Sequence, residues 1–142
     1  MLLPDVNVLV DAHRIEAPEH ERYAAWLTDV VVGPEPWALS EHVLSGFLRV
    51  VTHRKVWNTP TPLPVALAFV EGLRSRPNAR VLRPGPRHWE LFVAACRASR
   101  ARDKLVADAY HAALAMEHGC EWITADGDFA RFPGLRWRRP FE

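Results

Sequence analysis

The sequence predicts an α/β domain with a mostly parallel central sheet flanked by helices. Short apolar runs, typical of buried strands, alternate with longer segments whose apolar residues recur at helical spacing. The 142 residues suit a single domain over residues 1–142. A composition that is 49% hydrophobic, with six Trp and six Phe, can fill one core.

Two strands and two helices are predicted in the first half of the chain. β-propensity alone makes a strand of the apolar stretch 2–10. Pro18 suits the first position of a helix, and Ser40, which follows the apolar residues 37–39, is a favourable N-cap for the next one. The four elements are a strand over 2–10, a helix over 18–29, a strand over 30–32 and a helix over 43–51.

Three further helices and three short strands follow a basic, proline-punctuated loop at residues 52–64. Pro77 and Asn78 end the first of these helices. Gly119 suits the end of the last helix because glycine tolerates the left-handed conformation found there. The helices are predicted at 67–73, 89–96 and 105–116, and the strands at 81–82, 122–124 and 135–137.

The charge and the cysteines exclude several classes of protein. A net charge of +1 provides no overall attraction to nucleic acid or to a membrane, so any such role must rest on local patches. Cys96 and Cys120, the only cysteines, form no CxxC pair, which argues against a disulfide framework or a zinc site. Pro4 and Asp5 leave no room for a signal peptide, and no apolar run reaches the ~18 residues of a membrane span. We therefore expect a cytoplasmic protein.

Several acidic residues follow the predicted strands. Asp5 comes after the first short strand, and Glu41 lies in the first turn of the helix after the second strand. Asp126 and Asp128 come directly after a later strand. Asp108 lies within a helix, on its apolar face, where an uncompensated charge would be costly to bury. Because open α/β sheets carry their active sites at the carboxyl ends of the strands, we expect these acids to gather at one edge.

Each of these acids also has a purely structural explanation. Asp5 can cap the helix that follows it, and Glu41 can favour the positive end of its own helix. Asp126 and Asp128 can belong to an ordinary acidic turn, and Asp108 can form a buried salt bridge. The functional interpretation therefore depends on the whole set being at one edge of one sheet.

The acidic segments resemble the motifs of PIN-domain nucleases, and the whole chain is similar to the VapC toxins of bacterial VapBC toxin–antitoxin systems. The matching segments are 3–10, 39–41, 106–109 and 123–129, in the order of the family. The resemblance implies a PIN-like three-layer domain over residues 1–142. It also implies that the first strand stops at Asp5 and that residues 6–10 begin a helix, against their propensity.

The resemblance assigns a role to each acid. The acidic quartet of the family corresponds to Asp5, Glu41, Asp108 and Asp126, which are the expected catalytic residues and metal ligands. Asp128 stands at the position of a frequent auxiliary acid, and Asn7 matches a polar residue of the first motif. The family usually has Thr or Ser after the first aspartate, whereas this chain has Val6. A hydroxyl group that could orient the first acid is therefore missing.

The chemistry expected of such a cluster is metal-dependent hydrolysis. Several carboxylates in one pocket raise one another's pKa values, and a divalent cation relieves the repulsion. Mg²⁺ prefers oxygen ligands of this kind, and Mn²⁺ can substitute for it. The expected enzyme is an endoribonuclease in which a metal-activated water attacks the phosphodiester. The resemblance further implies a structured RNA substrate such as tRNA or rRNA, a homodimer, and a VapB-type antitoxin.

Basic residues near these acids are candidates for contact with RNA. Of the 18 basic residues 16 are Arg, whose planar guanidinium group suits bidentate contacts with phosphate. The candidate strips are His53, Arg54 and Lys55, then Arg100, Arg102 and Lys104, and lastly Arg136, Arg138 and Arg139. The alternative is that these side chains only solvate the surface. Trp57 could stack on a base, although a core or interface role is preferred.

Two other functions are alternatives to the nuclease. A phosphatase of the haloacid-dehalogenase type also begins with a strand that ends in Asp. It needs a second Asp where this chain has Asn7, and a suitably placed Lys, where only Lys55 and Lys104 exist. A catalytically silent PIN-like module that binds proteins would keep the fold, but an unused site has no reason to retain mutually repelling acids. Metal binding separates the nuclease from this module.

Overall fold

The computed structural model describes residues 1–142, which form six α-helices, one 3₁₀ helix and five strands. The strands are β1 (Leu2–Pro4), β2 (Trp37–Ser40), β3 (Ala79–Leu82), β4 (Glu121–Ile123) and β5 (Trp137–Arg138). The helices are α1 (Val6–His13), α2 (His20–Val32), α3 (Glu41–Val51), α4 (Leu63–Arg74), α5 (His88–Ser99), α6 (Lys104–Glu117) and the 3₁₀ helix η1 (Gly127–Arg131). None of the helices has the length and apolar character needed to cross a membrane.

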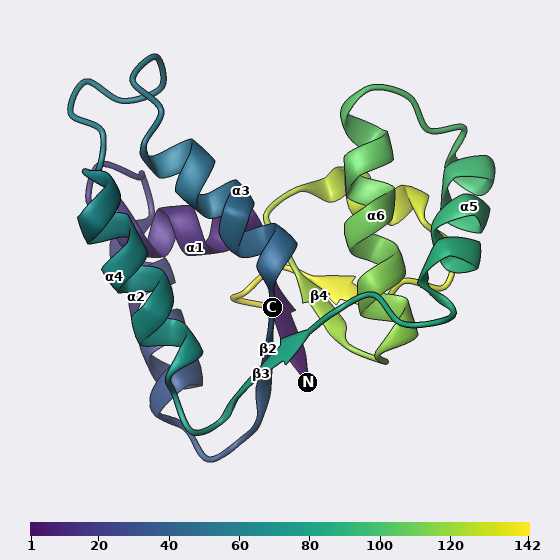
Figure 1. Cartoon of the computed structure of the whole chain (residues 1–142), viewed down its shortest axis with the longest axis horizontal. Helices are drawn as coiled ribbons and strands as arrows, with labels where there is room; N and C mark the ends of the chain where they lie inside the picture. Colours follow the sequence, from purple (N-terminus) through teal and green to yellow (C-terminus); the bar gives the residue numbers. More distant parts are fainter.

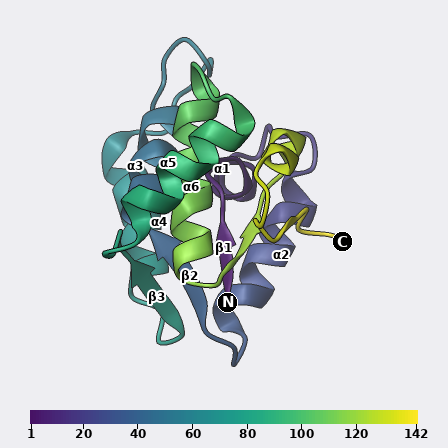
Figure 2. The ribbon, with the colours of Figure 1, turned by 90° about the vertical axis from the view of Figure 1, so that its right-hand side faces the viewer.

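All strand pairs in the structure are parallel. β4 pairs with both β1 and β5 in a three-stranded sheet, and β2 pairs with β3 in a two-stranded sheet. β1 lies beside β2, so the two sheets are neighbours. Figure 1 shows the strands between a group formed by α1 to α4 and the pair α5 and α6, and Figure 2 shows this pair in front of part of the sheet. The predicted α/β class, with a mostly parallel sheet flanked by helices, is confirmed. Because the strands are parallel, their carboxyl ends meet at one edge.

The core fills the space between the sheet and the helices. Trp37 on β2 and Trp122 on β4 are almost completely buried, as is Phe47 on α3. On α6, Ala109 and Ala112 have no exposed surface, and their small side chains let the helix lie close to the sheet. This close packing holds the face of α6 that carries Asp108 against the end of the sheet.

Residues 6–10 are helical, as the family resemblance implies and against their β-propensity. Asp5 is the N-cap of α1, because one of its carboxylate oxygens accepts a hydrogen bond from the Val6 N–H at 2.6 Å. Val8 and Leu9 point into the core with no exposed surface. Asp5 is therefore fixed between the end of β1 and the start of α1.

The strand expected over residues 30–32 is wrong. The three valines form the last turn of α2, and the N–H of Gly33 closes that turn on the Asp29 carbonyl at 3.1 Å. Val30 and Val31 pack against the core as part of this helix, so tertiary packing outweighs their β-propensity. The strand at this place in the chain is Trp37–Ser40, which pairs with β3.

Candidate active site

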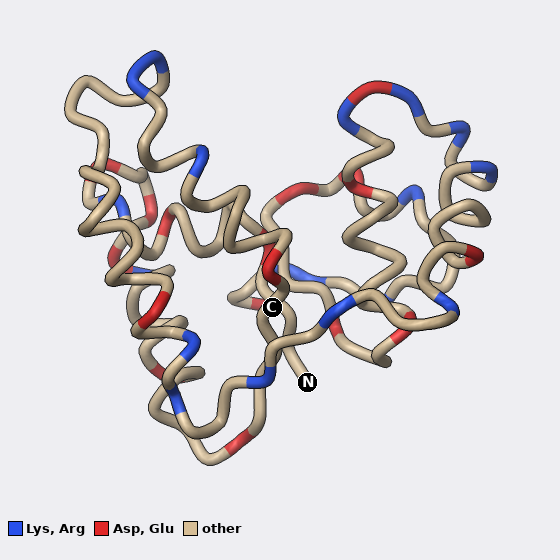
Figure 3. The backbone as a smooth tube through the Cα atoms, viewed as in Figure 1, with Lys and Arg blue, Asp and Glu red and all other residues tan.

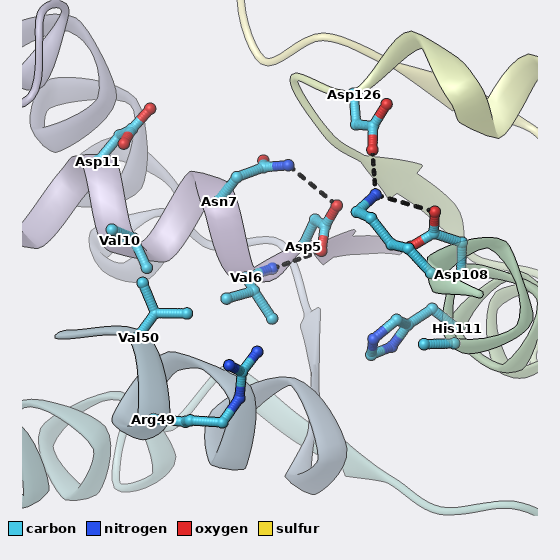
Figure 4. Close-up of a pocket in the computed structure, with 12 residues that line it drawn as sticks. Asp5, Val6, Asn7, Val10, Asp11, Arg49, Val50, Asp108, His111 and Asp126 are labelled. Atoms are coloured by element: carbon cyan, nitrogen blue, oxygen red, sulfur yellow. Dashed lines mark hydrogen bonds and ion pairs between the residues drawn. The ribbon is translucent and has the colours of Figure 1, made fainter. Parts of the chain in front are cut away.

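A pocket of about 380 Å³ lies beside the carboxyl ends of β1 and β4. Three of the five predicted acids line it, together with two basic side chains (Figure 4). These five residues are Asp5, Asp108, Asp126, Lys104 and Arg49. They come from distant parts of the sequence, and only the fold brings them together.

Asp5 is held by three hydrogen bonds in a buried position. Its two carboxylate oxygens accept from the Val6 N–H at 2.6 Å, from the Thr124 hydroxyl at 2.6 Å and from the Asn7 amide at 3.1 Å. Only 7% of the residue is exposed. The orientation of this carboxylate is therefore set by the protein before any ligand arrives.

Thr124 and Asn7 join the loop after β4 to the start of α1. The Thr124 hydroxyl donates to Asp5 and accepts from the Asp126 N–H at 3.0 Å and from the Asn7 amide at 3.2 Å. The Asn7 carbonyl oxygen accepts from the Ala125 N–H at 3.2 Å. Thr124 has no exposed surface, and its hydroxyl links the carboxylate of Asp5 to the backbone of Asp126.

The departure at Val6 has a structural counterpart. The hydroxyl that Thr or Ser would carry here is absent, and the Thr124 hydroxyl and the Val6 backbone N–H orient Asp5. The Val6 side chain instead packs against Gly46 on α3, where an added Cβ would lie 2.9 Å from Val6 Cγ2. Val6 therefore brings α3 close to the pocket.

Lys104 forms a bridge between the other two pocket acids. Its Nζ lies 3.0 Å from Asp108 Oδ2 and 2.7 Å from Asp126 Oδ2. The Lys104 side chain is 68% exposed, whereas that of Asp108 is 9% exposed. Since residues 104 and 108 are one helical turn apart, the lysine folds along α6 onto the aspartate.

The pKa values of the three pocket carboxylates differ because burial is opposed by different hydrogen bonds and charges at each of them. Burial raises the pKa of Asp5 to about 6, although the hydrogen bonds from Thr124 and Val6 lower it in part. Burial also raises the pKa of Asp108, and the contact with Lys104 only partly opposes this. Burial favours a higher pKa for Asp126 as well, but the hydrogen bonds from Lys104 and from the Asp128 N–H, together with the charge of Lys104, outweigh it and the pKa is lowered.

Asp128 lies next to the pocket and does not line it. Its backbone N–H donates to Asp126 Oδ1 at 2.9 Å, and Asp126 thereby caps η1. The Asp128 side chain is exposed. Its negative charge contributes to the raised pKa of Asp108.

The structure does not bring Glu41 to the pocket, in contrast to the expectation from the sequence. Glu41 follows β2 at the same edge of the sheet, but its carboxylate is bound by Arg74 at 3.0 Å and Arg83 at 3.0 Å. Arg74 ends α4 and Arg83 follows β3, so Glu41 faces the β2–β3 side of the edge. These hydrogen bonds hold the pKa of Glu41 below its ordinary value.

Three other pocket residues were not predicted from the sequence. Arg49 on α3 and Asp11 on α1 line the pocket, as does His111, one turn after Asp108 on α6. His111 stacks on Trp122 with ring centroids 5.2 Å apart, and its Nδ1 is buried without a hydrogen-bond partner. Burial lowers the pKa of His111 to about 4, so it is neutral at pH 7.

The predicted basic strips have different surroundings. Figure 3 shows Lys and Arg on the α3–α4 loop, which carries Arg54 and Lys55, and on the α5–α6 loop, at the same end of the molecule. Of the third strip, Arg138 is bound to Glu121 at 2.9 Å. Trp57 donates to the Val50 carbonyl at 2.9 Å and lies under the guanidinium group of Arg14, so its contacts are within the protein.

Comparison with known proteins identifies one family. The model of the PIN domain matches residues 2–135. The chain is similar to the VapC ribonuclease Mb2897 of Mycobacterium bovis, with 44% identity over 142 residues that cover 100% of this chain and 97% of that protein. It is also similar to ribonuclease VapC25 of Mycobacterium tuberculosis, with 38% identity over 140 residues that cover 99% of each.

Solved structures share the fold. The VapBC2 structure from Rickettsia felis, bound to a DNA fragment from the promoter, matches with a TM-score of 0.71 and 15% identity, over 97% of each chain. The VapC20 structure from Mycobacterium tuberculosis, a toxin that cleaves the sarcin-ricin loop, matches with a TM-score of 0.65 and 19% identity. That match covers 96% of this chain and 99% of VapC20.

Proposed function

This chain belongs to the PIN-domain family, and from that membership we propose how its pocket acts on RNA. Its relatives make it a VapC-like toxin, the endoribonuclease of a VapBC system. We propose that it hydrolyses a structured RNA such as tRNA or rRNA, with Mg²⁺ as the cofactor and Mn²⁺ as a substitute. The convergence of Asp5, Asp108 and Asp126 on one pocket carries this proposal.

The donor set of the pocket fits a divalent cation. Lys104 already places one positive charge between Asp108 and Asp126, so these carboxylates share a position that favours a cation. Carboxylate oxygens are the ligands that Mg²⁺ and Mn²⁺ prefer. No three His, Cys, Asp or Glu side chains are arranged to hold a metal ion in this structure. Because Lys104 occupies the position between Asp108 and Asp126, we infer that ion binding requires it to withdraw, which its exposed side chain allows.

We propose Asp5, Asp108 and Asp126 as the residues that hold the cation. When bound, the divalent cation supplies a water activated at neutral pH and stabilises the charge that develops on the phosphate. Thr124 holds Asp5 and the backbone of Asp126 in register through one hydroxyl. Glu41 joins this set only if its side chain leaves its two arginine partners.

Water, not a side chain, is the proposed nucleophile. No step requires the 2′-hydroxyl of RNA, so the expected products carry a 5′-phosphate and a 3′-hydroxyl group. Products with a 2′,3′-cyclic phosphate contradict this mechanism. We propose that the α3–α4 and α5–α6 loops, which carry Lys and Arg at the same end of the molecule (Figure 3), contact the RNA.

The proposed partners are a VapB-type antitoxin and a second copy of this chain. VapBC complexes are among the structures with the same fold. A basic side chain from an antitoxin would compensate the pocket acids in the way that Lys104 does. Co-expression with the neighbouring reading frame should yield a stable complex and relieve toxicity, and failure of both contradicts this part of the proposal.

The decisive experiment is cleavage of total cellular RNA by the purified chain, freed of any partner, in EDTA, Mg²⁺ or Mn²⁺. Discrete fragments that need the metal are expected from the wild type and are lost in Asp5→Asn. The matched control is Asp29→Asn, which changes the same charge at an exposed position on α2. Absence of cleavage in every metal, together with an unchanged melting temperature on metal addition, favours the silent protein-binding module.

A further inference from the structure

We propose that Arg49 binds the phosphate backbone of the RNA and positions it against the carboxylate pocket. This inference deepens the proposed nuclease function and rests on it. Arg49 lies on α3, across the pocket from Asp126, and Figure 4 shows its guanidinium group directed toward Val6 and Asp5. None of the acids that line the same pocket forms an ion pair with this arginine.

The packing of α3 on α1 sets the position of Arg49. Gly46 lies one helical turn before it and contacts Val6, where an added Cβ would approach Cγ2 to 2.9 Å. The missing side chain lets α3 come close to the residue that directly follows Asp5. Arg49 and Val50 come one turn later and line the pocket. The arginine is thus part of the wall and does not extend from a mobile loop.

Arg49 is the unpaired cation of the pocket. Lys104, the other permanently charged base in the wall, is bound by Asp108 and Asp126. Burial keeps His111 neutral at pH 7, since its pKa is lowered to about 4. The Arg49 side chain forms no hydrogen bond and no ion pair in the structure, so its N–H donors are available to a ligand.

The charge and shape of this group select a phosphodiester as its ligand. A pocket lined by carboxylates repels the RNA backbone, and a positive charge on the facing wall offsets that repulsion. The planar guanidinium group can donate two parallel N–H bonds to the two non-bridging oxygens of one phosphate. Such a contact fixes the register of the backbone and reads no base, so its effect is the same for every RNA sequence.

RNA binding in EDTA tests this assignment apart from catalysis. With labelled bulk tRNA as the probe, Arg49→Ala should weaken binding at least about tenfold and reduce the salt slope of log K by about one. Arg49→Lys should recover part of the affinity, because it keeps the charge and loses the fork. The control is Arg80→Ala, which removes an exposed arginine on β3 that bonds only nearby backbone carbonyls and should leave affinity unchanged.

Cleavage in Mn²⁺ supplies the second readout. Arg49→Ala should raise KM for the same tRNA, with an unchanged melting temperature; if this variant fails to fold, Arg49→Gln takes its place. Equal affinity and equal KM for the wild type and the variant overturn the role of Arg49 while the nuclease stands. A wild type that cleaves no RNA in either metal contradicts the nuclease instead, and the binding series in EDTA still decides whether Arg49 holds phosphate.

Discussion

Asp5 and Glu41 both follow parallel strands at one edge of the sheet, yet their carboxylates have opposite surroundings. Asp5 is buried and bound by neutral donors, and burial raises its pKa to about 6. Glu41 is exposed and bound by Arg74 and Arg83, which hold its pKa below the ordinary value. Both acids stand where a strand gives way to a helix, and their environments differ.

The different partners of these carboxylates indicate which of them a divalent cation can bind. Asp5 has no bound cation of its own, and Asp108 and Asp126 share one lysine on a flexible, exposed stem. Glu41 has two arginines, one of them with two donors on the same carboxylate. A divalent cation binds most favourably where the negative charge of the carboxylates is least neutralised by the protein. We therefore expect catalysis to depend on the pocket acids and not on Glu41 with its two arginines.

The largest expected effect is the loss of cleavage in Asp5→Asn. The substitution removes the one charge that the protein holds rigidly in the pocket, and we expect cleavage of RNA in Mg²⁺ or Mn²⁺ to fall on the order of a thousandfold. Initial rates with a mapped RNA target measure this. Activity within tenfold of the wild type would place the metal elsewhere, and Asp29→Asn should retain full activity.

The second effect concerns stability without metal. Between about pH 4 and pH 6 in EDTA, Asp5 should contribute a fall in the free energy of unfolding as the pH rises. The lowered pKa of His111 contributes a rise over the same window, so the part due to Asp5 is obtained by comparing the wild type with Asp5→Asn. Folding raises the pKa of Asp5 from 3.8 to about 6, so the folded state holds this proton more tightly than the unfolded state. The contribution is present below the unfolded pKa and is lost as the pH passes the folded one, by about 3 kcal/mol. Asp108, whose pKa is also raised, acts in the same direction.

Substitutions of Asp5 and Glu41 distinguish the contributions of these two acids to the pH dependence of unfolding. In urea unfolding between pH 4 and pH 6, the free energy of unfolding of Asp5→Asn should change with pH by a more positive slope than that of the wild type, because its side chain does not titrate. The lowered pKa of Glu41 has the opposite sign: it stabilises the fold above the unfolded pKa, and this is lost as the pH falls. Glu41→Gln should therefore change the slope near pH 4.5 in the direction opposite to Asp5→Asn. An identical slope in the wild type and Asp5→Asn contradicts the burial argument.

The third prediction tests the hydroxyl that replaces the one missing at Val6. Thr124→Val removes the donor to Asp5 and the acceptor for Asp126, and we expect roughly 10- to 100-fold weaker Mn²⁺ binding or cleavage. Isothermal titration measures the binding. The control is Thr52→Val, which deletes a hydroxyl bound to the Leu48 carbonyl away from the pocket. Equal affinity in both variants would mean that Asp5 does not need Thr124 for its orientation.

A smaller effect of opposite sign is expected from Lys104→Met. Because the lysine occupies the position between Asp108 and Asp126, its removal should tighten Mn²⁺ binding by up to about tenfold, a modest change because the ion pairs are partly exposed. The only other lysine, Lys55, makes no ion pair, and Lys55→Met should leave the affinity unchanged. Weaker Mn²⁺ binding in Lys104→Met would show that the lysine supports the metal site and does not compete with it.

The sequence predicted the layers of the fold better than the contacts of the site. Alternating apolar runs and helical periodicity indicate an α/β sheet, and the rule for carboxyl ends places Asp5 and Asp126 at one edge. The valines at 30–32 were misassigned because β-propensity ignores the core on which the end of α2 packs. Packing of the helix end against the core overrides local β-propensity here.

The sequence could not predict the direction in which the side chains of the site point. The first turn of a helix fixes where Glu41 begins, but the neighbours on α4 and after β3 decide which way it points. Lys104 was assigned to a surface strip, although its spacing of four residues from Asp108 already favours a pair along one helix face. Arg49 has no such signal, because its role depends on the contact between Gly46 and Val6 across two helices.

Glu41→Gln gives the smallest expected effect and the sharpest test of the comparison. If Glu41 keeps its arginine partners during the reaction, the substitution should change cleavage by less than about threefold, since exposed ion pairs contribute little. Cleavage kinetics of Glu41→Gln beside Asp5→Asn measure the difference directly. A loss as deep as that of Asp5→Asn would mean that Glu41 leaves Arg74 and Arg83 and joins the pocket when metal and RNA bind. The four acids of the family motif would then act together. The arginine-bound position of Glu41 would be one state of the site, and its position in the pocket would be the other.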